Sequence, residues 1–328
     1  MWRLCHACSQ PALPAPEIVL PGPGRTLATR MWVSFYRSVL FAFAGLAPDT
    51  AARLGAALGA CAFHLGVRRA TVSSNLARTL HLRGRHRRRV AQRCYQHVAA
   101  TFVEAWGIHS CPVPARILNP QWLAHLRRGG RGMVFVSLHL GNWDAAGAAV
   151  ARATGKMMVF ARRQRDQVLN DVQVALRIQS GISIVFAKHG RSTDMLSVLR
   201  LLRGGGCLGL MADQLPRRHE GCEGYFLGVP TRLHTGPAVL ARLSRSILVP
   251  GVSLRCGNGE HIFITGRPVP AAATDEETTQ RCMDVLAAMI AAHPEQYFWH
   301  HRRFKRVVTL PPRLTMPSGL QSWGCPPR

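Results

Sequence analysis

The stretch GMVFVSLHLGNWDAAGAA, residues 132–149, joins a titratable imidazole to a carboxylate across a short turn. A run of β-forming residues, 133–138, ends on His139, and a run of small helix-forming residues begins just after Trp143 and Asp144. An imidazole can take a proton from a hydroxyl near neutral pH when a carboxylate fixes its tautomer and stabilises the imidazolium. The H-x-x-x-x-D spacing therefore predicts a histidine–aspartate dyad that needs no protein nucleophile.

The turn between these two residues is typical of a strand-to-helix junction. Gly141 gives the backbone room to turn, and Asn142 can cap the following helix. His139 would then lie at the carboxyl end of its strand, where open α/β sheets bind ligands. A strand-end histidine bonded only to backbone is the alternative. His189 and Asp194 have the same spacing, but their sequence, HGRSTD, indicates a polar loop before a helix.

Strands and helices alternate between residues 131 and 266, which predicts an α/β sheet flanked by helices. The expected strands are 133–138, 157–161, 182–186, 207–211, 247–254 and 261–265. The expected helices are 143–152, 167–180, 193–203 and 236–244. Thr274 and Glu277 form a capping box, which predicts a last helix running to about His293.

The two ends of the chain differ from this middle part. Residues 1–30 are rich in proline, so we expect a disordered extension, with Met31 as an alternative start. Residues 306–328 are expected to be a disordered tail. The remainder divides into membrane-associated helices over 31–110 and a catalytic domain over 111–305.

The apolar N-terminal region is interrupted by charges at Arg37, Asp49 and Arg53. It therefore lacks the roughly 20 uninterrupted apolar residues of a spanning helix. We expect two helices joined near Pro48, one a short anchor and the other lying in the membrane interface, with the arginines at 68–69 beside anionic head groups. Two ordinary core helices are the alternative.

The chain is strongly basic, with 42 Lys+Arg against 16 Asp+Glu and a formal net charge of +26. Such a field attracts nucleic acid, anionic membranes or acidic proteins. The densest block, RGRHRRR at 83–89, is either a binding surface or a solvated helix face. The absence of zinc-finger spacing and of an aromatic RNP-type strand argues against nucleic acid. A basic protein that binds nucleic acid or anionic lipid without catalysis stays the alternative function.

The ten cysteines do not predict a disulfide scaffold in a chain of this length. Cys5 and Cys8 form a C-x-x-C pair without a second pair at zinc spacing, so no metal centre and no cofactor are expected. Cys61, Cys207 and Cys282 lie in apolar runs and are expected to be core residues. Reduced thiols favour a location on the cytoplasmic side.

The motif HLGNWD resembles the H-x4-(D/E) signature of the bacterial lipid A biosynthesis acyltransferases, of the lauroyl/myristoyl type, and of their relatives that acylate phosphatidylinositol mannosides. The resemblance extends in order from about Met31 to Lys305. Its other landmarks are RRATVSSNLARTL (68–80), LRGGGCLGLMADQ (202–214), YFLGVPTRLHTGPAVLARLSRSILVPG (225–251) and HPEQYFWHHRRFK (293–305). Leu227 replaces a usual Phe, and Asp144 replaces the Glu common in the lipid A enzymes, although Asp also occurs in the mannoside branch.

This resemblance implies a mixed, mostly parallel sheet of the glycerol-3-phosphate acyltransferase type. It also implies transfer of a fatty acyl group from acyl carrier protein or acyl-CoA to a glycolipid hydroxyl, at the cytoplasmic face of the inner membrane. His139 would be the general base, and Asp144 would orient it. The residues expected to contact substrate or organise the site are Arg177, Asp213, Gln214 and Asn142.

Structural alternatives are a solvated helix residue for Arg177 and a turn-forming carboxylate for Asp213. An acidic acyl carrier protein, a phosphorylated glycolipid and an anionic membrane surface would all be attracted to a basic enzyme. Genome composition is the alternative source of the surplus arginine. The resemblance leaves the acceptor and the acyl-chain length open.

Overall fold

The computed structural model describes residues 31, 34, 35, 38, 39, 42, 46–107, 115–163, 167–186, 193–257, 259–306, 308–311 and 323. The expected extension 1–30, most of the tail 306–328, the Cys5–Cys8 pair and His189 lie outside these residues. The segment expected to form a short anchor, before Pro48, lies largely outside them as well.

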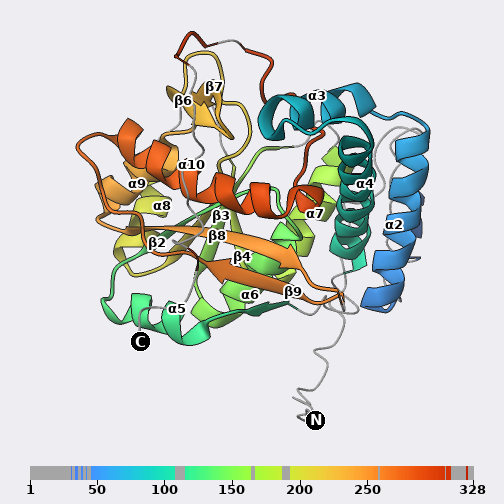
Figure 1. The fold of residues 1–328 in the computed structure, drawn as a ribbon. Helices are drawn as coiled ribbons and strands as arrows, with labels where there is room; N and C mark the ends of the chain where they lie inside the picture. Colours follow the sequence, from blue (N-terminus) through green and yellow to red (C-terminus); the bar gives the residue numbers. More distant parts are fainter. Residues whose placement is uncertain are drawn as a thin grey trace, which may run out of the picture.

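A seven-stranded sheet forms the centre of the molecule (Figure 1). Its strand order is β1-β9-β8-β2-β5-β3-β4, and among the described strands of this sheet, β8 and β9 alone pair antiparallel. The strands are β1 (Ala115–Ile117), β2 (Met133–Ser137), β3 (Met157–Ala161), β4 (Ile182–Phe186), β5 (Cys207–Met211), β8 (Ile247–Arg255) and β9 (His261–Thr265). The expected mostly parallel α/β sheet is confirmed.

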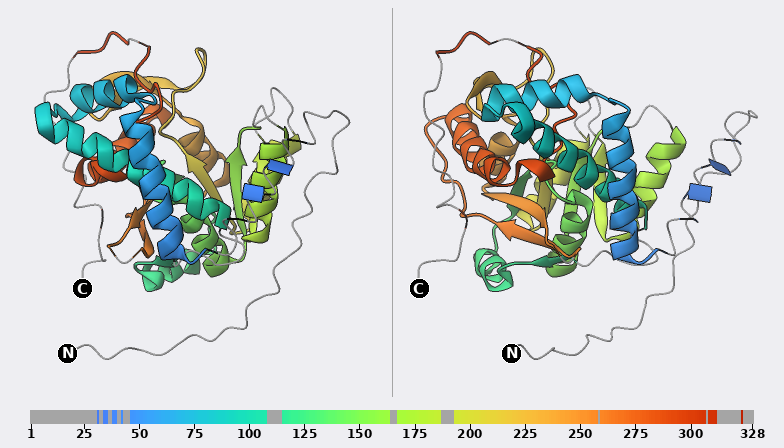
Figure 2. Two further views of the ribbon diagram at one scale, coloured as in Figure 1. Left: turned by 90° about the vertical axis from the view of Figure 1, so that its right-hand side faces the viewer. Right: turned by 45° about the vertical axis from the view of Figure 1, so that its right-hand side comes forward.

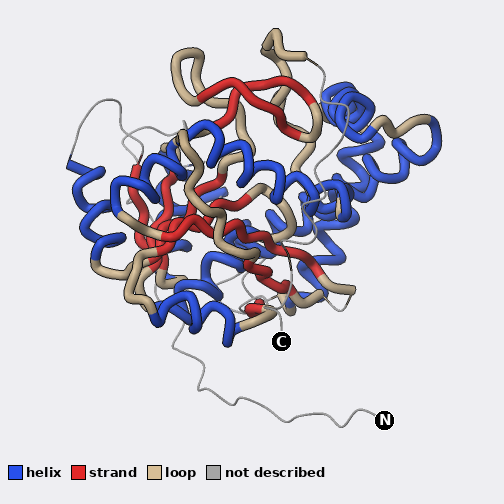
Figure 3. Tube along the Cα trace, turned by 60° about the vertical axis from the view of Figure 1, so that its left-hand side comes forward, coloured by secondary structure: helices blue, strands red, loops and turns tan. Residues whose placement is uncertain are grey.

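Helices cover both faces of this sheet, as a mostly parallel sheet requires (Figure 3). Alternate side chains of β2 point to opposite faces. Val134 and Val136 pack in the core with α8 (Thr193–Arg203), α9 (Gly236–Ser244) and α10 (Asp275–Ala292). Met133 and Phe135 pack on the other face with α5 (Pro120–Arg128) and α6 (Trp143–Thr154). Further elements are α7 (Gln167–Gln179), the 3-10 turn η1 (Pro294–Gln296), and an antiparallel hairpin of β6 (Cys222–Phe226) and β7 (Val229–Leu233), which projects from the main body in Figure 3.

Two predicted details of this fold are confirmed. The Thr274 side chain caps α10 by accepting a hydrogen bond from the backbone N–H of Glu277. Cys207 and Cys282 are buried. Cys61 is exposed, which corrects the expectation that it belongs to the core, because it lies on the outer face of its helix.

The N-terminal helices α2 (Pro48–His64), α3 (Arg69–Leu80) and α4 (Gly84–Gly107) pack beside the sheet (Figure 2). The backbones of α2 and α4 approach closely at Gly59, which has no Cβ. A Cβ at this position would lie only 2.2 Å from the Tyr95 carbonyl oxygen. Side chains from all three helices share one core with the strands. The outer face of α2 leaves Leu54 and Leu58 exposed.

Within the described ranges, none of the helices taken singly combines the length and apolarity needed to cross a bilayer. The pair α2 and α3 meets these criteria jointly, with a bend of 92° at the break between them. The arginine-rich block at 83–89 begins α4 and is largely exposed to solvent.

Candidate active site

His139 and Asp213 meet because the strands that precede them are adjacent, parallel and in register. Ser137, the last residue of β2, pairs with Met211, the last residue of β5. Each site residue follows two positions later, at the same edge of the sheet. Asp213 Oδ1 lies 2.8 Å from His139 Nδ1, and Asp213 Oδ2 accepts a hydrogen bond of 3.0 Å from the His139 backbone N–H.

This pairing fixes the imidazole in a form suited to a general base. When Nδ1 carries the proton shared with Asp213, the lone pair of Nε2 is left available. Burial by itself lowers the pKa of His139, but the charge and hydrogen bond of Asp213 outweigh it and raise the pKa above 6.5. Burial acts against ionisation of Asp213 too, yet His139 holds the pKa of that carboxyl below its usual range. The aromatic rings of Trp143 and Phe298 flank the imidazole.

Asp144 pairs with Arg177 instead of the histidine ring. Its Oδ1 accepts a hydrogen bond of 2.9 Å from Arg177 Nε, and both side chains are about one quarter exposed. This corrects the expectation that Asp144 fixes the imidazole tautomer: at the start of α6 its carboxylate is turned toward α7. The Asp144 charge still favours the imidazolium form of His139, and the Arg177 charge disfavours it.

Residues 296–298 of the C-terminal segment are hydrogen-bonded to the loop that carries His139. The His139 carbonyl accepts a hydrogen bond of 2.9 Å from the backbone N–H of Phe298, and Gly141 N–H donates to the Gln296 carbonyl at 3.1 Å. Tyr297 is buried, and its hydroxyl donates a hydrogen bond to Asp213. Burial first, and then the charge of this carboxylate, raise the pKa of the phenol well above 10.

The sequence had assigned no role to Tyr297. Its available signal was the landmark HPEQYFWHHRRFK, whose residues 296 and 298 form backbone hydrogen bonds with the loop that carries His139. Arg303, from the same landmark, is buried, donates to Thr231 Oγ1 at 2.9 Å, and carries its positive charge close to Asp213.

Asn142 lies beneath the site rather than in it. Its side chain is fully buried, and its Oδ1 caps α6 by accepting a hydrogen bond of 3.0 Å from the Ala145 N–H, which confirms the predicted cap. The expected contact with substrate is corrected, because the amide is used within the protein. Gly141 has φ 62°, and a Cβ there would lie 2.4 Å from the Ser253 carbonyl oxygen, so this turn requires glycine.

Two cavities share the same polar mouth, lined by His139, Asp144, Arg177 and Gln214. The smaller, of about 220 Å³, lies between α4, α6 and α7. The larger, of about 1200 Å³, extends between α6 and the sheet. Its inner wall consists mainly of apolar residues and glycines: Phe135, Ala146, Gly147, Val150, Met157, Val159, Gly209 and Phe263. An extended apolar group could therefore lie in the interior with its polar end beside His139.

Among the residues that the structure describes, no group of three or more His, Cys, Asp or Glu side chains is arranged to hold a metal ion. The polar groups at the mouth include the imidazole of His139, the carboxylate of Asp144 and the guanidinium of Arg177, and the carboxylate of Asp213 is hydrogen-bonded to the imidazole. Such a set is suited to moving a proton and to binding an anionic group.

Comparison with known proteins gives one family and several relatives. The model of the bacterial lipid A biosynthesis acyltransferase family matches residues 23–306. A phosphatidylinositol mannoside acyltransferase of Mycobacterium tuberculosis (strain ATCC 25618 / H37Rv) is 29% identical over 171 residues, which are 52% of this chain and 53% of the relative. The lipid A biosynthesis palmitoleoyltransferase of Escherichia coli (strain K12) is 27% identical over 179 residues, 53% of this chain and 56% of the relative. These alignments span about half the length of each relative.

A third relative, the lipid A biosynthesis lauroyltransferase of Escherichia coli (strain K12), matches over more of its length. It is 25% identical over 292 residues, which are 85% of this chain and 93% of the relative.

Proposed function

Because the chain belongs to the bacterial lipid A biosynthesis acyltransferase family, we propose that it transfers a fatty acyl group from a thioester donor to a hydroxyl of a membrane glycolipid. The observation that carries this proposal is the position of His139, hydrogen-bonded to Asp213 at the mouth of a large, mainly apolar cavity. The names of the relatives support acyl transfer to glycolipids.

His139 acts as the general base in this reaction. Its Nε2 accepts the proton of the acceptor hydroxyl while the hydroxyl oxygen attacks the thioester carbonyl carbon. The C–S bond of the resulting tetrahedral intermediate then breaks, and the imidazolium returns the proton to the leaving thiolate. The products are an ester and a free thiol, and no acyl-enzyme is formed. Asp213 keeps Nδ1 protonated and stabilises the imidazolium between the two steps.

The larger cavity holds the fatty acyl chain. Its apolar interior removes the chain from water, which is worth about 0.8 kcal/mol for each buried methylene. The reacting carbonyl then lies at the polar mouth, beside His139 and Gln214. The end of the cavity that is farther from the mouth limits the length of chain that the enzyme accepts.

Arg177 supplies positive charge at this mouth. Asp144 occupies its Nε, and this ion pair fixes the plane of the guanidinium. The terminal nitrogens carry four further N–H donors, which suit a phosphate of the acceptor or the oxyanion that develops during transfer. Asp144 therefore positions Arg177, and it acts on His139 through its charge.

The basic surface concentrates the partners. An acyl carrier protein is acidic, a thioester of coenzyme A carries phosphates, and the cytoplasmic face of the inner membrane is anionic. With a net charge of +26, the protein attracts all three. We therefore propose that it works at this membrane surface.

The test combines purified protein, acyl carrier protein or coenzyme A thioesters, and lipids extracted from the cells that produce it. Lipid mass spectrometry should detect a glycolipid that has gained one acyl chain, and the product should be absent with His139→Ala. Transfer at the full rate by His139→Ala would overturn the assignment of the base. If the intact protein neither acylates lipid nor hydrolyses the thioester, the non-catalytic basic binding protein is the better description.

A further inference from the structure

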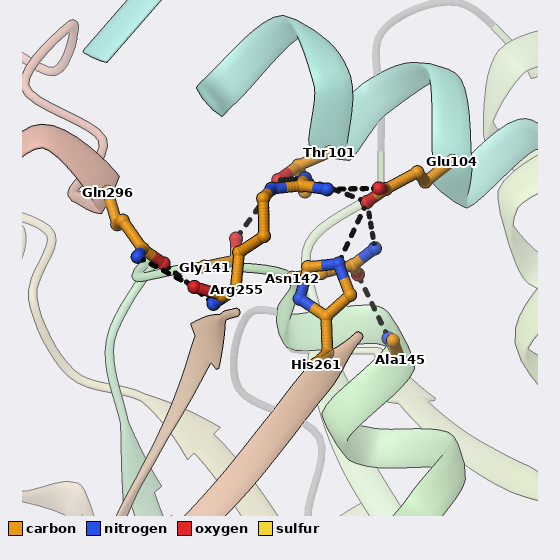
Figure 4. Close-up of polar contacts among 8 residues, drawn as sticks. All are labelled: Thr101, Glu104, Gly141, Asn142, Ala145, Arg255, His261 and Gln296. Carbon is orange, nitrogen blue, oxygen red and sulfur yellow. Dashed lines mark hydrogen bonds and ion pairs between the residues drawn. The ribbon is translucent and has the colours of Figure 1, made fainter. Parts of the chain in front are cut away.

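A carboxylate that is fully withdrawn from solvent, Glu104 of α4, lies beside the turn at residues 141–142, which follows His139 in the sequence (Figure 4). Its Oε2 accepts a hydrogen bond of 2.9 Å from the Asn142 side-chain amide. Arg255, at the end of β8, binds both of its oxygens. The ring nitrogen Nε2 of His261 lies 3.1 Å from the same Oε2. Neither cavity at the mouth is lined by Glu104.

The hydrogen bond to Asn142 determines which way that amide faces. The nitrogen Nδ2 donates to Glu104, so the oxygen Oδ1 must face Ala145, where it caps α6. The orientation of this cap sets where the chain leaves the turn and enters the helix. Asp144 lies in the first turn of this helix, and His139 lies just before the turn. One interaction from α4 thus constrains both ends of the H-x4-D motif.

The same cluster also holds the backbone on the other side of the turn. Thr101, one turn before Glu104 in α4, donates to the Gly141 carbonyl at 3.1 Å. Gln296 makes two side-chain hydrogen bonds to the backbone of Arg255, of 2.8 and 3.1 Å. The carbonyl of Gln296 accepts the Gly141 N–H. As Figure 4 shows, these contacts form one connected network around residues 141–142.

A fully buried ion pair loses the hydration of both charges, which is a large desolvation cost in free energy. Burial raises the pKa of Glu104, but hydrogen bonds from His261 and Arg255 outweigh it and keep the carboxyl ionised. Apolar side chains of similar volume often give equal or greater stability at such a site. The directional bonds of the carboxylate provide something that packing does not, a defined orientation for the Asn142 amide.

We propose that Glu104 is a positioning residue for the acyl transfer, holding the imidazole of His139 against Asp213 through Asn142 and Arg255. This inference rests on the proposed function, in which His139 is the base. It assigns part of the catalytic geometry to the N-terminal helical layer, since Glu104 belongs to α4 and lies 35 residues before His139 in the sequence.

The first test is Glu104→Gln in the acyl transfer assay. Without the Glu104 carboxylate, the Asn142 amide is no longer held in one orientation, and the turn at residues 141–142 should shift. Small displacements of a catalytic group can reduce the rate by about 100-fold. We expect kcat to fall about 10- to 100-fold while KM for the acyl donor stays within about threefold. In the pH profile of kcat/KM, the acid limb should also move to lower pH. The reason is that His139 loses its close contact with Asp213, which raises the pKa of the imidazole.

The pH profile depends on the charged groups that face His139 from each packed element. These are Asp213 after β5, Asp144 of α6, Arg177 of α7 and His301 of the C-terminal segment. None of them is changed in Glu104→Gln. A shift of the acid limb that appears in this variant and is reversed in a double variant with the original cluster charge reports a movement of the imidazole among them, and not the loss of the Glu104 charge.

Rescue provides the decisive comparison. Asn142→Asp alone keeps a good helix cap but places two carboxylates together, so its kcat should fall as well. In the double variant Glu104→Gln/Asn142→Asp, the donor and acceptor exchange places at the contact between the two side chains, and the net charge of the cluster is unchanged. Arg255 Nη2, which donates to Glu104 Oε2 in the parent protein, then has the carboxylate at position 142 as its acceptor. We expect kcat to recover at least tenfold relative to either single variant. Failure to recover would overturn the proposal.

Ser244→Ala serves as the matched control for lost stability. Ser244 is also buried, and it bonds to Ser246 at the opposite end of the sheet, just before β8 begins. Its variant should lower the Tm without changing kcat or the acid limb. If Ser244→Ala lowers kcat as much as Glu104→Gln does at an equal loss of Tm, Glu104 is merely structural.

A readout without catalysis separates this proposal from the proposed function. The pKa of His139, measured by NMR of ¹⁵N-labelled histidine and assigned with His139→Gln, should be lower in Glu104→Gln than in the parent protein. An unchanged pKa would overturn the positioning role even if acyl transfer is observed. A lowered pKa in a protein without transferase activity would support positioning and count against the proposed function alone.

Discussion

Asp144 Oδ1 and Arg177 Nε form a hydrogen-bonded ion pair of 2.9 Å beside His139, whose own ring is hydrogen-bonded to Asp213. The two carboxylates near the imidazole therefore have different partners. Asp213 acts on the imidazole through a hydrogen bond and through charge, whereas Asp144 acts through charge and through the arginine that it holds. This difference predicts unequal effects of mutation.

Asp213→Asn should be the more damaging of two matched substitutions. It removes the acceptor that fixes the Nδ1 proton, and loss of this interaction costs about 10²- to 10⁴-fold in kcat in comparable histidine–aspartate pairs. Asp144→Asn leaves the hydrogen bond to His139 in place, so a loss of about tenfold, shared between kcat and KM for the acceptor, is expected. Steady-state kinetics on both variants measures the ranking, and the reverse order would contradict the geometry.

The rate should depend on pH through His139. The imidazole accepts a proton only in its neutral form, so kcat/KM falls as the pH decreases through its pKa. That pKa lies above 6.5, because the attraction of Asp213 exceeds the effect of burial. Asp213→Asn removes this attraction and should move the acid limb to lower pH. A limb that stays in place in Asp213→Asn, or a flat profile in the parent protein, would exclude His139 as the titrating base.

The sequence predicted the central strands closely because each is a short run of β-branched and apolar residues bounded by turns. It missed β1, which has three residues, and the hairpin of β6 and β7, where charged and glycine residues interrupt the apolar pattern. It also missed α5, whose short polar sequence has one buried residue, Leu123. These elements depend on tertiary contacts that a local pattern does not contain.

The site was predicted in composition but not in pairing. His139 and Asp144 are close in sequence, so their spacing pointed to a local dyad. The hydrogen-bonded carboxylate comes from Asp213, because β5 lies next to β2 in the sheet. Strand order is not visible in residue spacing. A usable signal was present, since each of these two residues follows a strong strand at the same distance. Glu104 gave no signal, because nothing in α4 indicates its partners.

The length of the transferred acyl chain should respond to Gly147 of α6. This residue lines the larger cavity, and a Cβ there would lie 3.0 Å from Cδ1 of the Ile182 side chain, which can shift. Gly147→Val therefore fills part of the cavity. Loss of space for two methylenes, at about 0.8 kcal/mol each, should change the preference between long and short donors about tenfold.

The measurement is kcat/KM for a series of acyl donors of graded length. Ala153→Val is the control, since it places the same β-branched residue on the exposed face of α6. An unchanged preference in Gly147→Val would argue that the chain occupies another site.

The exposed apolar face of α2 should contribute to membrane attachment. Leu58 is about half exposed there. Leu58→Glu should weaken binding to anionic vesicles, whereas Ala153→Glu on α6, which changes the charge equally, should have a much smaller effect. Sedimentation with vesicles measures both, and equal losses would indicate a general effect of charge.

The arginines at the start of α4 should contribute through charge alone. Arg85 and Arg89 are exposed, and each basic residue near an anionic bilayer is worth about 1 kcal/mol. The double variant Arg85→Gln/Arg89→Gln should therefore bind anionic vesicles roughly 30-fold more weakly and with a smaller dependence on salt, because fewer counterions are involved. Binding to neutral vesicles should not change. If the variant instead loses binding to single-stranded DNA and keeps its affinity for vesicles, this basic face serves nucleic acid, and the membrane role belongs to α2.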